Sequence, residues 1–254
     1  MSTPEPAASH QAPRAGKKTL GQPGGLLEST ALFNGMRHIA IEGAIGVGKS
    51  SLARRLGIHL GAELMMEAAD ENPLLERFYA DQPGYAFQTQ LVFLFQRLKQ
   101  MQSLAQPGMF SSTVVSDFVF AKDALFARMN LSDEEYRLYA QMYAQAAQQV
   151  PEPDLVIWLQ ASPATLLQRI RRRGIRMEQG ITEDYLQRLC DAYTGHFQSY
   201  DGAPVFSVAT EHFNPANHED DFARLLDTLS GFSGRRGNFD STGQESRATP
   251  VAPG

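Results

Sequence analysis

A glycine-rich segment that ends in a lysine and a serine has the residue types and the spacing of a phosphate-binding site. Residues 43–50 read GAIGVGKS, which matches the pattern G-x-x-x-x-G-K-S. Gly43, Gly46 and Gly48 allow the backbone to turn with its N–H groups pointing inward, where a side chain would block a phosphate. Lys49 would reach the terminal phosphates, and the hydroxyl of Ser50 would hold Mg²⁺.

The flanking sequence supports this interpretation. An apolar run at 39–41 predicts a strand before the loop, and Leu52, Leu56 and Leu60 recur at helical spacing after it. A helix that begins near Lys49 places its positive dipole end on the same anion. The alternative, a glycine-rich turn beside an ordinary surface lysine, accounts for none of these flanking features. We therefore expect a nucleoside triphosphate to be held by Gly43, Ala44, Ile45, Gly46, Val47, Gly48, Lys49, Ser50 and Ser51.

Two acidic residues come directly after other strand-like runs. Glu67 follows the short apolar run at 63–66, and Asp117 follows the β-branched run at 113–116. In a parallel sheet the carboxyl ends of the strands meet at one edge, so both acids should lie near Gly43. A carboxylate there could coordinate Mg²⁺ through water or accept a proton from an attacking hydroxyl. A helix cap or an exposed acid is the structural alternative.

A cluster of arginines surrounds Gly174. The segment 169–176 reads RIRRRGIR, and such basic runs are often only solvated helix faces. In a phosphoryl-transfer protein, a mobile segment with arginines can close over the phosphates and neutralise charge in the transition state. We expect Arg173 and Arg176 to lie in a lid of this kind.

The elements that must position these residues alternate along the chain. Helical patterns separate the apolar runs, and Ser132-Asp-Glu-Glu135 is a capping box that predicts the start of one helix. Strands separated by helices predict a parallel sheet with right-handed crossovers. The expected fold class is α/β, a P-loop three-layer fold with a parallel sheet of about five strands flanked by helices. The expected strands lie at 39–41, 63–66, 113–116, 154–159 and 204–208.

Both ends of the chain have a different composition. Residues 1–34 and 232–254 are rich in Pro, Gly, Ser, Thr and Ala and show little hydrophobic periodicity. Segments of this kind cannot bury enough apolar area to offset their conformational entropy. We expect two disordered tails around one folded domain at 35–231.

The overall composition narrows the classes of function. The net charge of −5 over 254 residues argues against a protein that binds nucleic acid polymers, because phosphate backbones require a basic surface. The beginning MSTPEPAASHQAP lacks the apolar core of a secretory signal, and no apolar run approaches the length of a membrane span. A single cysteine, Cys190, gives no disulfide framework. We expect a cytoplasmic protein without a membrane partner.

Five segments, taken in order, resemble the deoxynucleoside kinases, and in particular the bacterial deoxyguanosine and deoxyadenosine kinases. They read GAIGVGKS, ENPLLERFY after Glu67, FQTQLVFLFQR, SDFVFAKD and RRRGIRMEQGI, and the resemblance extends from about His38 to Val208. It implies an ATP-dependent transfer of the γ-phosphoryl group to the 5′-hydroxyl of a deoxynucleoside. It also implies a homodimer, and the overall likeness favours a purine substrate.

The resemblance further implies roles for individual residues. Glu67 matches the general base that takes the proton from the 5′-hydroxyl. Tyr79 and Glu178 match the pair that hydrogen-bonds the 3′-hydroxyl. Gln88 matches the amide that reads the base edge with its donor and acceptor, and Asp123 lies where an acid often faces the base. From the residues alone, Tyr79 and Gln88 would be interpreted as a half-buried aromatic and a helix-surface amide.

The sequence departs from the family pattern at three places. Many members have an arginine where this chain has Phe118, and Lys122 or Arg128 could supply the missing charge. Phe95 falls where some members have an arginine in the base pocket, which leaves the choice between purine and pyrimidine open. The lid reads G-I-R where G-R is common, which leaves open the arginine that meets the phosphates.

Two other functions are compatible with the motifs. A nucleoside monophosphate kinase shares the phosphate loop and the lid, but Glu67 has the wrong charge to hold an acceptor's phosphate. A nucleotide-binding module that has lost catalysis would explain the missing arginine at Phe118. The presence of Lys49, Ser50 and Glu67 together argues against it.

Overall fold

Six parallel strands form one sheet at the centre of the protein. The computed structural model describes residues 33–80, 84–105 and 113–239, so most of the two expected tails lies outside it. The strand order is β2-β3-β1-β4-β5-β6, and every pairing between neighbours is parallel. The expected α/β class is confirmed, with one strand more than expected. The strands are β1 (His38–Gly43), β2 (Glu63–Met65), β3 (Val114–Ser116), β4 (Leu155–Gln160), β5 (Val205–Ala209) and β6 (Arg236–Phe239).

The additional strand, β6, lies in a segment that the composition placed in the C-terminal tail. Gly237 gives it a close approach to the sheet, since a Cβ there would lie 2.6 Å from the ring of Phe206 and 2.7 Å from that of Phe232. Arg236 donates hydrogen bonds to main-chain carbonyls at the end of α8 (Glu183–Ser199), and the ring of Phe239 packs on Phe213 at 4.5 Å between centroids. The folded domain therefore extends beyond residue 231.

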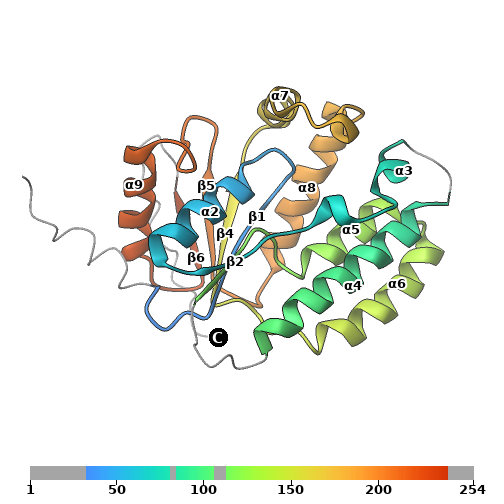
Figure 1. Cartoon of the computed structure of the whole chain (residues 1–254), viewed down its shortest axis with the longest axis horizontal. Coiled ribbons are helices and arrows are strands. Elements are labelled where there is room, and N and C mark those ends of the chain that lie inside the picture. The colour runs from blue at the N-terminus through green and yellow to red at the C-terminus, as the bar shows by residue number, and fades with distance from the viewer. Residues whose placement is uncertain (1–32, 81–83, 106–112, 240–254) are drawn as a thin grey trace, which may run out of the picture.

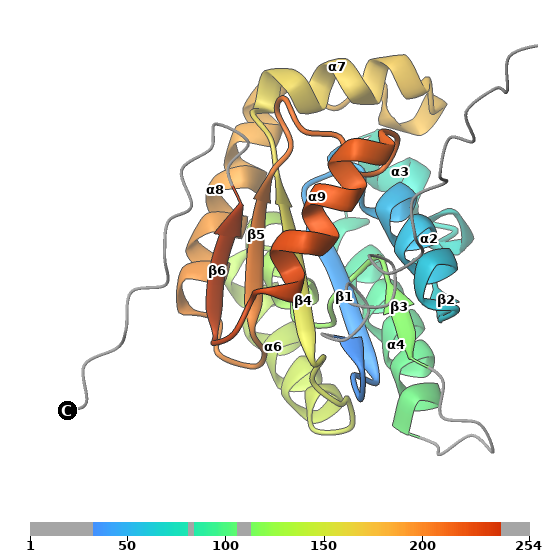
Figure 2. The same ribbon diagram turned by 90° about the vertical axis from the view of Figure 1, so that its left-hand side faces the viewer.

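Helices cover both faces of the sheet. Figure 2 shows α2 (Lys49–Leu60) and α9 (Glu219–Ser230) on one face, while α4 (Ala86–Ala105), α6 (Asp133–Ala147) and α8 lie on the other. In Figure 1, α7 (Pro163–Arg173) crosses above the carboxyl ends of the strands. The remaining helices are α3 (Leu75–Tyr79), α5 (Lys122–Asn130) and the short 3₁₀ turns at Ala69–Glu71 and Arg176–Glu178.

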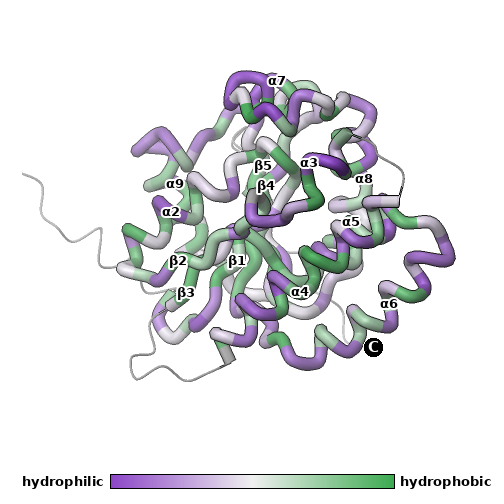
Figure 3. The backbone as a smooth tube through the Cα atoms, turned by 45° about the vertical axis from the view of Figure 1, so that its right-hand side comes forward, coloured by the Kyte–Doolittle hydropathy of each residue, from purple (hydrophilic) through white to green (hydrophobic). Residues whose placement is uncertain are grey.

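The buried residues fall into two clusters. The larger one joins the strands to α2, α7, α8 and α9 and includes the fully buried Ile39, Ile41 and Ile157. The smaller one lies among α4, α5 and α6. Figure 3 shows the central strands as largely hydrophobic and α7 as largely hydrophilic. The sheet is therefore the centre of the larger apolar core, and a more polar helix lies at its carboxyl edge.

No helix in the described part of the chain combines the length and the apolar character that a membrane span needs.

Candidate active site

The loop between β1 and α2 has the open backbone that its sequence predicts. Gly43, Gly46 and Gly48 have φ angles of 148°, 86° and 108°, a region that side chains disfavour. A Cβ at Gly43 would lie 2.4 Å from the carbonyl oxygen of Leu159. Gly48 caps α2 without a side-chain hydrogen bond, and the first turn of α2 contains no acid. The amide groups at this helix end are therefore free to bind an anion.

Lys49 and Ser50 extend from the same helix end toward the loop and the neighbouring strand. The Nζ of Lys49 donates to the carbonyl oxygens of Gly43 at 2.7 Å and Ala44 at 3.2 Å. Burial lowers the pKa of this ammonium, and the positive charge of Lys122 lowers it further. Ser50 Oγ donates to Asp117 at 2.5 Å. The site thus places a cation and two oxygen ligands of the kind that Mg²⁺ prefers beside the phosphate loop.

Asp117 connects this region to the end of β2. Its second carboxylate oxygen accepts a hydrogen bond from the backbone N–H of Glu67 at 2.6 Å. Since Asp117 follows β3 and Glu67 follows β2, the interaction fixes two neighbouring strand ends against each other. The two acids thus lie together at the carboxyl ends of neighbouring strands, and both line one cavity with Gly46 and Lys49 of the phosphate loop.

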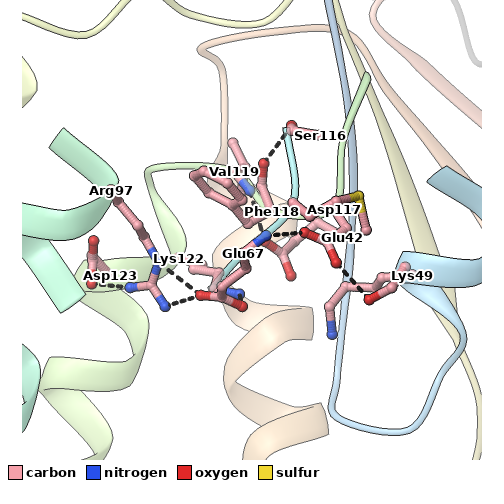
Figure 4. Close-up of polar contacts among 12 residues, drawn as sticks. Glu42, Lys49, Glu67, Arg97, Ser116, Asp117, Phe118, Val119, Lys122 and Asp123 are labelled. Atoms are coloured by element: carbon pink, nitrogen blue, oxygen red, sulfur yellow. Dashed lines mark hydrogen bonds and ion pairs between the residues drawn. The ribbon is translucent and has the colours of Figure 1, made fainter. Parts of the chain in front are cut away.

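The carboxylate of Glu67 is held by two buried cations (Figure 4). Its Oε1 accepts from Nε of Arg97 at 2.9 Å and also from Nη2, and its Oε2 accepts from Nζ of Lys122 at 2.7 Å. Burial alone would raise the pKa of Glu67, but the charges and hydrogen bonds of Arg97 and Lys122 outweigh burial and lower this pKa. Glu67 is therefore ionised and able to accept a hydrogen bond.

Asp123 is the second acidic partner of Arg97. It is 0% exposed, and it accepts a hydrogen bond from Nη1 of the arginine. Burial raises the pKa of Asp123 to about 6, although Arg97 opposes that rise. Asp123 is not among the residues that line the cavity at this site. Its effect on a ligand would thus be exerted through Arg97.

A cavity of about 360 Å³ joins these groups, which is within the usual size range of small-molecule sites. Lys49, Ser50, Glu67 and Asp117 line one part of it. Aromatic side chains form much of the remaining wall, including Phe78, Phe93, Phe126 and Tyr185. The cavity therefore combines charged and polar groups with an aromatic wall.

The segment after α7 closes one side of this cavity. Nη2 of Arg173 donates to both carboxylate oxygens of Glu178, at 2.7 and 2.6 Å. Tyr79 lines the cavity beside Glu178, and burial raises the pKa of its hydroxyl, with further contributions from Tyr185 and Glu178. Both Arg173 and Arg176 are exposed, but Arg173 lines the cavity and Arg176 does not. Only one of the two expected lid arginines thus reaches the site.

Comparisons with known proteins agree with this arrangement. A family model described as deoxynucleoside kinase matches residues 39–232. The chain belongs to the deoxynucleoside kinase family. It therefore phosphorylates deoxynucleosides, and the sequence resemblance is confirmed.

Several individual relatives are similar over most of this kinase. A deoxyguanosine kinase of Bacillus subtilis is 34% identical over 162 residues, which cover 63% of this chain and 78% of the relative. A deoxyadenosine kinase of Lactobacillus acidophilus is 33% identical, with coverage of 67% and 84%. The structure of deoxyadenosine kinase from M. mycoides with bound dATP superimposes with a TM-score of 0.64 at 27% identity, covering 76% of this chain and 98% of that one.

On α4 of this kinase, the residues inside the site differ from the expected ones by two positions. Gln88 is exposed and outside the cavity, whereas Gln90 is 2% exposed and lines it. Phe95 is likewise 53% exposed, and Arg97 faces the site instead. Two residues along a helix correspond to a rotation of about 200°, so the two sets lie on opposite faces. The placement of Gln88 is corrected, and the spacing of Gln90, Phe93 and Arg97 is the signal that could have found it.

A positive charge lies beside Glu67 four residues after Phe118. Phe118 is fully buried in the cluster of α4, α5 and α6. Arg128 points to solvent and pairs with Asp133 at 2.7 Å. Lys122 is the alternative that lines the cavity and contacts Glu67. Of the two candidates that the sequence left open, the structure places Lys122 in the site.

Proposed function

We propose that this kinase transfers the γ-phosphoryl group of ATP, with Mg²⁺, to the 5′-hydroxyl of a purine deoxynucleoside. The observation that supports the proposal is that one cavity is lined by Lys49 and Ser50 from the phosphate loop and by the ionised Glu67. A hydroxyl bound at Glu67 would face a triphosphate bound at the loop. The names of two of the relatives, a deoxyguanosine kinase and a deoxyadenosine kinase, support the preference for purines, although another relative is a deoxyadenosine/deoxycytidine kinase.

The donor side fits a magnesium nucleotide. The amide groups of the loop and the first turn of α2 would hold the phosphates, and Lys49 would leave the carbonyls of Gly43 and Ala44 to bind them. Ser50 and Asp117 would hold Mg²⁺, which neutralises phosphate charge when it is bound. Within the described residues, no three acidic, histidine or cysteine side chains form a metal cluster. This suits Mg²⁺, which usually takes one or two protein ligands besides phosphates and water.

The acceptor side fits a nucleoside. Tyr79 and Glu178 would bind the 3′-hydroxyl, because a phenol and a carboxylate together offer a donor and acceptors to one alcohol. Gln90 would read the base edge, since its buried Oε1 has no hydrogen-bond partner in the described residues. Phe93 and Phe126 would contact the base and sugar faces.

Glu67 would act as the general base. The transition state of phosphoryl transfer is loose, so alignment of the hydroxyl and stabilisation of charge dominate the catalysis. Glu67 would orient the hydroxyl and take its proton, while Lys49 and Arg173 would stabilise the phosphoryl oxygens.

Replacement of Glu67 tests this role. Glu67→Gln retains the shape but cannot accept the proton, so we expect kcat to fall by about 10²- to 10⁴-fold while both ligands still bind. Turnover and calorimetric dissociation constants would be measured together. Glu76→Gln, an exposed acid on α3, is the matched control. A near-normal kcat for Glu67→Gln would show that another group is the base.

The substrate can be tested directly. A panel of purine and pyrimidine deoxynucleosides and of nucleoside monophosphates would be incubated with labelled ATP and the intact protein. We expect label on purine deoxynucleosides. Label on a monophosphate would support a nucleoside monophosphate kinase instead, and binding without transfer would support a module that has lost catalysis.

The proposal extends to assembly and location. We propose a homodimer, supported by Phe95 and Leu138, which are each 53% exposed on the neighbouring helices α4 and α6. Multi-angle light scattering at micromolar concentration would detect it. A cytoplasmic location is supported by the single cysteine, Cys190, in the sequence.

A further inference from the structure

Lys122 is a buried cation that none of the roles above requires. We propose that Lys122 is a positioning residue, which fixes one oxygen of Glu67 so that its remaining lone pair receives the substrate hydroxyl. This inference rests on the proposed function, because it concerns the carboxylate assigned as the general base.

The burial of Lys122 needs an explanation. Its side chain is only 4% exposed, and Glu67 is its one acidic partner within the described residues. The neighbouring acid, Asp123, pairs with Arg97 instead. Removing an ammonium from water costs free energy that an apolar side chain of similar size avoids, and many buried ion pairs do not stabilise a fold. A role in the site accounts for a lysine at this position better than stability does.

The hydrogen bonds of Glu67 show where a hydroxyl can bind. A carboxylate offers about four lone-pair positions. Arg97 occupies Oε1 with two donors, Nε and Nη2, and Lys122 occupies one position on Oε2. The position that is left is on Oε2. The hydroxyl and the ammonium of Lys122 would therefore share this oxygen, and the lysine would set its direction.

Among the described residues, no cation besides Lys122 donates a hydrogen bond to Oε2, since both bonds from Arg97 go to Oε1. Position 118 holds a buried aromatic ring, and Arg128 lies in solvent. Lys49 lines the same cavity but is hydrogen-bonded to the phosphate loop. Lys122 also lies 5.9 Å from the ring centroid of Phe126, which limits the positions its ammonium can adopt.

Lys122 orients Glu67 during the chemical step and does not itself transfer a proton. The hydroxyl proton moves to Oε2 of Glu67, the hydroxyl oxygen forms a bond to the γ-phosphorus, and the bond from that phosphorus to the β-phosphate oxygen breaks. Lys122 keeps its proton throughout. Without Lys122, the lone pair of Oε2 would point away from the hydroxyl. Proton transfer would then be slower, while the binding of both substrates would be almost unchanged.

The test separates positioning from folding. Lys122→Met and Lys122→Arg would be compared with Arg128→Met, the matched exposed control, for kcat, KM and calorimetric dissociation constants. We expect Lys122→Met to lose about 100-fold in kcat, the size of effect that a misplacement near 1 Å produces, with both KM values within about threefold. Lys122→Arg should recover most of kcat, and Arg128→Met should match the wild type.

A second variant distinguishes the loss of positioning from the loss of the folded state. Lys122→Ala should regain turnover when methylammonium is added, in a saturable manner, because the small cation can occupy the vacated position. The inference is overturned if Lys122→Met keeps kcat within about threefold. It is also overturned if neither arginine nor methylammonium restores turnover to a folded variant. If Glu67→Gln loses turnover and Lys122→Met keeps it, the positioning role of Lys122 fails and the proposed function stands. If both variants keep turnover, the assignment of Glu67 as the general base is wrong as well.

Discussion

Arg97 pairs with the buried carboxylate of Asp123 and the partly buried carboxylate of Glu67, and its removal should therefore have a large effect on stability. The arginine is 4% exposed and donates to Glu67 and Asp123, which the chain brings from two other elements. Removing one partner of a buried ion pair costs about 3–5 kcal/mol, because the other charge remains without compensation. We expect Arg97→Met to lose this amount near neutral pH.

The loss should grow with pH. With Arg97 present, burial already raises the pKa of Asp123 to about 6 from 3.8. A carboxyl whose pKa is raised in the folded state loses stability as pH rises from the unfolded to the folded value. Without Arg97 the folded pKa rises further, so stability continues to fall above pH 6. The difference from wild type should then increase by up to about 1.4 kcal/mol per pH unit between pH 6 and pH 8.

Urea unfolding at pH 6, 7 and 8 would measure these differences. The variants are Arg97→Met, Asp123→Asn and the double variant, with the exposed Arg137→Met as control, which should stay within about 0.5 kcal/mol of wild type. The double variant should be more stable than the sum of the single effects by about 1–3 kcal/mol. Additive single effects, or a loss below about 1 kcal/mol at pH 8, would refute the claim that Arg97 compensates Asp123.

Two further outcomes are expected. Ser116 Oγ donates to a carbonyl, so His38 must donate to Ser116 from Nε2. Nδ1 of the neutral ring is then a buried acceptor that no donor among the described residues reaches, and burial lowers the pKa of His38 to about 4. Wild-type stability should fall by about 3 kcal/mol between pH 6.5 and pH 4 through this group, and urea unfolding of His38→Gln should show a correspondingly smaller fall. Gln90→Leu should raise KM for the deoxynucleoside by about 10-fold or more, whereas Gln88→Leu should leave it unchanged; equal effects in steady-state assays would contradict the assignment.

The parts of the site that could be predicted from sequence depend on local rules. The spacing of the glycines and Lys49 fixes the phosphate loop, and the carboxyl ends of parallel strands must lie together, which is why Glu67 and Asp117 meet. The capping box at Ser132 likewise starts α6 where it was expected, since both of its hydrogen bonds form within one turn. Each of these features is determined by neighbours in the sequence or by sheet topology.

The orientation of α4 could not be predicted in this way. Apolar residues occur around much of this helix, including Phe93 on the cavity side and Phe95 on the exposed side. Hydrophobic periodicity then does not identify the inner face. An arginine is also normally expected outside, and Arg97 is buried only because acids 30 and 26 residues away meet it. Ion pairs with residues far away in the sequence thus determine which face of α4 turns inward.

The location of Lys122 depends on a contact still farther away in sequence. Glu42, fully buried at the end of β1, accepts a hydrogen bond from the backbone N–H of Val119 at 2.9 Å, across 77 residues. Ser116 donates to the carbonyl of Phe118 at 2.7 Å, so the peptide group between Phe118 and Val119 is held at both its carbonyl and its N–H. The side chain of Phe118 lies in the apolar cluster of α4, α5 and α6. A cation four residues later, Lys122 at the start of α5, reaches the cavity instead, and a chain that buries an aromatic ring at 118 can therefore keep a positive charge beside Glu67.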